Sequence, residues 1–92
     1  MNNGEAHVFT DNFQIEADFR GETLTYTEGT QRTQMTWTWT WTNGYTVYSD
    51  SIEPWRNADG SRTPMSEEER KIVLERMVDY ALKVQRVKMK VE

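Results

Sequence analysis

Hydrophobic and polar residues alternate most strictly over residues 35–42, which read Met-Thr-Trp-Thr-Trp-Thr-Trp-Thr. Successive side chains of a β-strand point to opposite faces of a sheet. The stretch therefore places Met35, Trp37, Trp39 and Trp41 on one face and four threonines on the other. A helix would scatter the same side chains around its whole circumference. The pattern predicts a strand, which we expect at the centre of a sheet.

The indole face of this strand has two interpretations. Each Trp side chain covers roughly 150–250 Å², so three uncovered indoles would form an apolar patch at or beyond the largest that is usual on a monomer. We therefore favour burial, with Trp39 under the helix residues Leu74, Met77 and Ala81. An exposed platform for sugar rings or for a partner is the alternative. The threonine face is expected to face solvent.

Shorter alternations on both sides of this strand predict four more strands. They cover residues 7–10, 13–19, 23–27 and 45–49, and turn residues separate them. Asn43-Gly44 favours a type I′ hairpin, because both residues tolerate positive φ. The short, even spacing of the turns indicates an antiparallel meander rather than strands joined by crossover helices.

Residues 50–65 form a long connection that contains Pro54, Pro64 and the fourth tryptophan, Trp55. Connections of this length in a compact domain are often functional. We favour the interpretation that Trp55 fastens the segment onto the core. The alternative is that its indole binds a partner.

A helix is predicted to begin at Ser66, with Glu69 three residues later closing a capping box. The consecutive carboxylates Glu67, Glu68 and Glu69 suit the first turn of a helix better than a metal site. The helix is expected to end near Lys83. Its apolar stripe comprises Val73, Leu74, Met77, Val78, Ala81 and Leu82.

A final strand is predicted over residues 87–92, with Val87, Met89 and Val91 facing inward. Its outward lysines, Lys88 and Lys90, are typical of an edge strand. The elements predict one α+β domain over residues 1–92, with residues 1–6 frayed. It has an antiparallel meander of about five strands, one amphipathic helix on the indole face and a C-terminal strand that rejoins the sheet (β-β-β-β-β-α-β). One helix is about 10–12 Å across and covers such a sheet only partly, which slightly favours a homodimer.

Charge and composition narrow the classes of function. The chain has 15 acidic and 11 basic residues, a net charge of -4, and no basic run for phosphates, so nucleic-acid binding is not expected. An acidic chain suits a basic protein partner. The absence of cysteine removes disulfide and Cys–zinc chemistry and is consistent with a cytoplasmic location. Neither a signal peptide nor a membrane span is expected.

Candidate catalytic chemistry is sparse. There is one histidine, His7, and it lies near the expected frayed end. No nucleophile–base pair, metal-ligand spacing or phosphate-binding glycine loop stands out. We therefore expect a protein that is not an enzyme and that uses no cofactor and no metal.

Two stretches carry a resemblance to a known family. They are Tyr48-Ser49-Asp50-Ser51-Ile52-Glu53-Pro54-Trp55 and Thr63-Pro64-Met65-Ser66-Glu67-Glu68-Glu69-Arg70. With the amphipathic helix and terminal strand that follow, residues 45–92 resemble the immunity protein seventy-four family of bacterial polymorphic toxin systems. Residues 56–58 and the Thr-Trp alternation depart from that pattern.

The resemblance implies a non-catalytic inhibitor that binds a cognate toxin protein. Its contact site would then be acidic and aromatic and would lie outside the core, which favours Asp50, Glu53, Trp55 and Asp59. Two alternatives stay open. One is a domain that binds a small ligand or carbohydrate through exposed tryptophans, and the other is an α+β domain that only self-associates.

Overall fold

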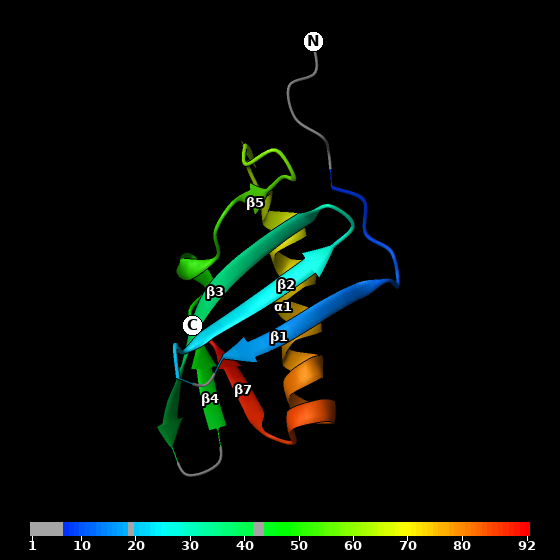
Figure 1. Ribbon diagram of the computed structural model, residues 1–92. Coiled ribbons are helices and arrows are strands. Elements are labelled where there is room, and N and C mark those ends of the chain that lie inside the picture. The colour runs from blue at the N-terminus through cyan, green and yellow to red at the C-terminus, as the bar shows by residue number, and fades with distance from the viewer. Residues whose placement is uncertain (1–6, 19, 42–43) are drawn as a thin grey trace.

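The computed structural model describes residues 7–18, 20–41 and 44–92, except for the side chains of Thr40 and Trp41. Figure 1 shows a twisted sheet with one long helix lying across its back. The strands are β1 (Phe13–Asp18), β2 (Thr23–Glu28), β3 (Gln31–Trp41), β4 (Gly44–Val47), β5 (Trp55–Arg56), β6 (Arg62–Thr63) and β7 (Lys88–Val91). The helices are the short η1 (Ser49–Ser51), then α1 (Glu67–Tyr80), which continues as the π-helical turn η2 (Ala81–Gln85).

The sheet order β1-β2-β3-β4-β7 confirms the predicted fold class and the central position of the Thr-Trp strand. Strands β1 to β4 pair antiparallel with their sequence neighbours, as a meander does. Strand β7 returns after the helix and pairs parallel with β4. The small hairpin β5–β6 extends the sheet beside the first half of β3, through the pair Arg32 and Arg56.

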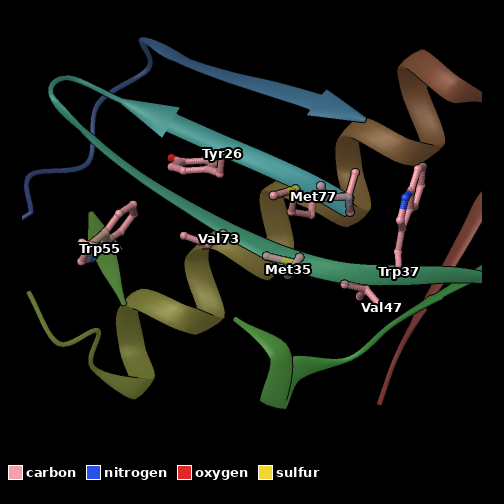
Figure 2. Close-up of a cluster of buried hydrophobic side chains, with 8 residues drawn as sticks. Tyr26, Met35, Trp37, Val47, Trp55, Val73 and Met77 are labelled. Carbon is pink, nitrogen blue, oxygen red and sulfur yellow. The ribbon is translucent and has the colours of Figure 1, made fainter. Parts of the chain in front are cut away.

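Helix α1 packs against the face of the sheet that carries Met35 and Trp37, as the alternation predicts. Figure 2 shows Trp55 and Trp37 at opposite ends of the core, with helix residues Val73 and Met77 between them. The buried cluster consists of Leu24, Tyr26, Met35, Trp37, Val47, Trp55, Val73 and Met77.

The prediction for Trp39 is wrong, because its side chain is 48% exposed. Strand β3 has 11 residues, roughly 36 Å at the usual rise per residue, and its last part runs beyond the helix (Figure 1). Trp37 takes the covered position instead, at 1% exposure. The side chain of Trp41, the predicted strand residue Phe19 and the turn residue Asn43 lie outside what the structure describes.

The helix start is as predicted. The Ser66 side chain accepts a hydrogen bond from the Glu69 amide at 3.1 Å, and the Glu69 carboxylate accepts one from the Ser66 amide at 2.9 Å. The helix runs on through η2 to Gln85, two residues past the predicted end, and stops where Arg86 takes a left-handed φ of 57°. The prediction that Leu82 belongs to the buried apolar stripe is wrong, because its side chain is exposed.

Residues 7–10 do not form the predicted strand. Their polar groups are used differently, because His7 and Thr10 hydrogen-bond to the side chain of Glu28. Residues 50–65 are also more regular than expected, since they contain η1 and the β5–β6 hairpin.

Candidate functional site

The three acidic residues predicted to bind a partner are all exposed, but they lie in separate parts of their segment. Asp50 is in η1, Glu53 precedes β5, and Asp59 is in the β5–β6 turn. The Asp59 carboxylate accepts hydrogen bonds from the Ser61 hydroxyl and amide, and these lower the pKa of Asp59. The segment thus presents single charges at several places rather than one acidic patch.

Trp55, the fourth predicted partner residue, is fully buried. The imidazole of His7 stacks on its indole with ring centroids 3.8 Å apart, and Phe9 meets it edge-on at 6.2 Å. The interpretation that Trp55 fastens the segment onto the core is therefore confirmed. In this fold its indole has no surface left for a partner.

A buried carboxylate, Glu28, lies beside this aromatic group and is 3% exposed. It accepts hydrogen bonds from the Tyr26 hydroxyl at 2.6 Å, from His7 Nε2 at 2.9 Å, and from both the amide and the hydroxyl of Thr10. Arg76 of the helix approaches it at 3.5 Å and donates to the Tyr26 oxygen at 2.6 Å. Charged and polar donors from three parts of the chain thus converge on one carboxylate.

These contacts set the protonation of the cluster. Burial alone would raise the pKa of Glu28, but the hydrogen bonds from Tyr26, Thr10 and His7 outweigh it and lower the pKa to about 2. Burial, with the hydrogen bond and negative charge of Glu28, raises the pKa of Tyr26 above its ordinary value, although Arg76 acts in the opposite direction. A buried carboxyl with so low a pKa is a weak base at neutral pH, so the cluster is suited to holding the fold together.

A second set of hydrogen bonds joins the cluster to the β5–β6 hairpin. His7 Nδ1 lies 2.8 Å from Gln31 Oε1, and Gln31 Nε2 donates to Asn57 Oδ1 at 2.9 Å. Asn57 in turn donates to the hydroxyls of Ser61 and Thr63. Sequence reasoning missed this network. The one available signal was that Glu28 lies on the same strand face as Leu24 and Tyr26, where a carboxylate needs partners.

An exposed apolar surface lies at the other end of the molecule. Trp39 meets Tyr45 edge-on at 4.7 Å, and Tyr45 stacks on buried Trp37 at 4.1 Å. The cross-strand neighbour of Tyr45 on β7 is Met89. The apolar side of the sheet thus continues from the core into solvent on the ends of β3, β4 and β7.

A groove lies between α1 and β7, the strand that carries Met89. It has a volume of about 470 Å³, and its apolar lining comes from Leu74, Val78, Leu82 and Val91. Leu82 is 57% exposed and Val91 is 42% exposed. Lys71, Glu75 and Asp79 border the groove. We name Trp39, Leu82, Val91 and this groove the apolar end of the molecule.

No protein-family model, curated protein or solved structure matches this chain. Within the described ranges, no three His, Asp or Glu side chains are grouped so that they could hold a metal ion. No helix in the described part of the chain has the length and apolar character needed to cross a membrane.

Proposed function

We propose that this chain is a non-catalytic protein-binding module, an immunity-type inhibitor that binds and neutralises a cognate bacterial toxin. Two exposed apolar features support this most strongly, the half-exposed indole of Trp39 and the apolar groove between α1 and β7. Tryptophan is among the residues that most often dominate binding energy at protein interfaces. Large exposed apolar side chains that gather in one region mark interaction surfaces.

The proposed contact has an apolar centre, and acidic residues outside it contribute to the encounter with a partner. The apolar end supplies the centre. Asp50, Glu53 and Asp59 are exposed elsewhere on the surface, where they would act on the rate of encounter with a basic partner rather than on the lifetime of the complex. In this proposal the aromatic residue that contacts the partner is Trp39, in place of Trp55, which the sequence analysis had named.

A carbohydrate-binding domain is the second candidate, and the exposure of Trp39 also favours it. The groove between α1 and β7 argues for a protein partner instead, because its surface is mainly apolar, from Leu74, Val78, Leu82 and Val91, and offers few polar groups to bind sugar hydroxyls. A second copy of this chain is a further occupant of the same surface.

The decisive experiment is co-expression of the tagged chain with the proteins of neighbouring reading frames, followed by pull-down and binding kinetics. We expect Trp39→Ala to speed dissociation of the captured toxin, at a cost of about 2 kcal/mol or more. Val8→Ala removes another exposed apolar side chain far from the groove in sequence and serves as the control. Glu53→Lys is expected to slow association and to change its dependence on salt.

Three outcomes would contradict the proposal. One is that no neighbouring toxin is captured. The second is that Trp39→Ala and Val8→Ala leave the dissociation rate equally unchanged. The third is that iodide quenches Trp39 emission and that sugars relieve this quenching. That result would favour the carbohydrate-binding candidate. Light scattering at micromolar concentration tests the self-association alternative. A self-associating chain would have the mass of a dimer, and the Leu82→Glu variant would have the mass of a monomer.

A further inference from the structure

Three arginines occupy directly opposite positions on neighbouring strands. Arg32 on β3 pairs with Arg56 on β5, and Arg56 pairs with Arg62 on β6. Opposite residues of antiparallel strands point to the same face, with Cβ atoms about 4.5–5.5 Å apart. All three side chains are exposed on the sheet face opposite the helix, which Figure 1 shows open toward the viewer. We name them the arginine row.

Glu53 lies near the arginine row, because it lines a small pocket together with Arg32 and Arg56. Arg62 lies 4.0 Å from Glu53, and both side chains are about half exposed. No ion pair joins Arg32 or Arg56 to another described residue. The row continues across the sheet through Thr27 and Gln14, which are uncharged. Like charges directly opposite one another destabilise a sheet. The charges of these arginines therefore do not contribute to the stability of the fold.

A cleft of about 310 Å³ opens beside Arg32 and Arg56, between the β2–β3 turn and the β5–β6 turn. The cleft is lined by Thr27, Gly29, Thr30, Gln31, Arg32, Arg56, Asn57, Ala58 and Gly60. The lining includes two arginines and two threonines and contains no Asp or Glu. A cleft with many donors and no carboxylate is suited to an anion.

We propose that this cleft is a binding site for a phosphate group on a small molecule. The guanidiniums of Arg32 and Arg56 flank the phosphate oxygens, because the planar Arg fork donates two parallel hydrogen bonds to such an oxyanion. The threonine hydroxyls supply further donors. Arg62, next in the row, lies where a second anionic group of the same ligand would be neutralised. The site is on the open face of the sheet, and its lining contains no residue of the apolar end.

The test uses inorganic phosphate and pyrophosphate as probes, with the full chain titrated at low salt by NMR and by calorimetry. We expect saturable binding of one pyrophosphate, tighter than phosphate, with amide shifts around Gly29 and Asn57. Arg32→Gln and Arg56→Gln should each weaken binding by about tenfold or more, as expected for losing a charge-assisted hydrogen bond. Arg62→Gln should reduce the preference for pyrophosphate over phosphate. Arg20→Gln removes an exposed arginine from another turn and should change the affinity less than twofold.

Thermal unfolding separates a lost site from a lost fold. Pyrophosphate should raise the midpoint of the wild type and of Arg20→Gln but not that of Arg56→Gln, whose own midpoint should not fall, because a like-charge contact has been removed. The proposal is overturned if binding of neither probe saturates. It is also overturned if the control variant Arg20→Gln weakens binding as much as Arg32→Gln and Arg56→Gln do. It is also overturned if an Asp/Glu-rich peptide binds the row more tightly than pyrophosphate does, since the site would then recognise acidic protein segments.

Discussion

The imidazole of His7 lies flat on the indole of Trp55, with ring centroids 3.8 Å apart and planes within 10°. The two residues come from opposite halves of the chain. Their contact joins the segment before β1 to the β5–β6 hairpin, and it places His7 Nε2 against the buried carboxylate of Glu28. Trp55 is 0% exposed, and His7 is one of the residues that cover it.

A double-mutant cycle should measure the coupling between His7 and Trp55. Stacked aromatic pairs contribute about 0.5–1.5 kcal/mol beyond the area that they bury, so the two Ala substitutions together should cost less than their sum by that amount. The measurement is the free energy of unfolding by urea for the wild type, both single variants and the double variant. A cycle between His7 and Trp37, at the far end of the core, is the control and should show no coupling.

Trp37 and Trp39 should differ sharply in their effect on stability, although they are two residues apart on one strand face. Trp37→Ala should cost about 3–5 kcal/mol, the usual range for removing a buried aromatic side chain. Trp39→Ala should cost clearly less, because nearly half of its side chain is already exposed. Urea unfolding monitored by far-UV circular dichroism checks both values. Equal losses would mean that the end of β3 is covered.

Stability should fall in acid as Glu28 is protonated. Its pKa is lowered from 4.5 to about 2 in the folded state, so the unfolded chain binds the proton more readily. The contribution is present above about pH 4.5 and is lost as the pH falls toward 2. At 1.36 kcal/mol per pKa unit, the loss is on the order of 3 kcal/mol.

The Glu28→Gln variant tests this assignment, because it removes the titrating group while it keeps the shape of the side chain. Unfolding free energies between pH 7 and pH 2 should show a shallower acid dependence for the variant than for the wild type, and a lower stability at pH 7. Identical acid slopes would assign the titration to other carboxylates.

The capping box at the start of α1 should be measurable separately from the core. Ser66→Ala leaves the Glu69 amide without its acceptor and should cost about 1 kcal/mol. Ser66→Asp keeps an acceptor at the same position and should retain most of the stability. If both variants unfold at the same urea concentration, the cap contributes nothing at this helix.

Sequence periodicity predicted the elements whose signal is local. The alternation of Met35, Thr36 and Trp37 is a backbone property of a strand, and the Ser66–Glu69 box forms within one helical turn. The elements β1, β2 and β3 and the start of α1 therefore lie where the pattern places them. The return of the last strand to the sheet also followed from its own alternation.

Only the tertiary structure decided which residues of a face are covered and which polar groups meet. Trp37 and Trp39 are equivalent in the alternating pattern, and the length and crossing of α1 bury one and leave the other in solvent. The Glu28 cluster and the arginine row both join residues that are far apart in sequence, through pairing registers that alternation cannot specify. Local sequence determines which way a side chain points. Its neighbours across the fold determine whether it is buried in the core, hydrogen-bonded in a polar cluster or exposed on the surface.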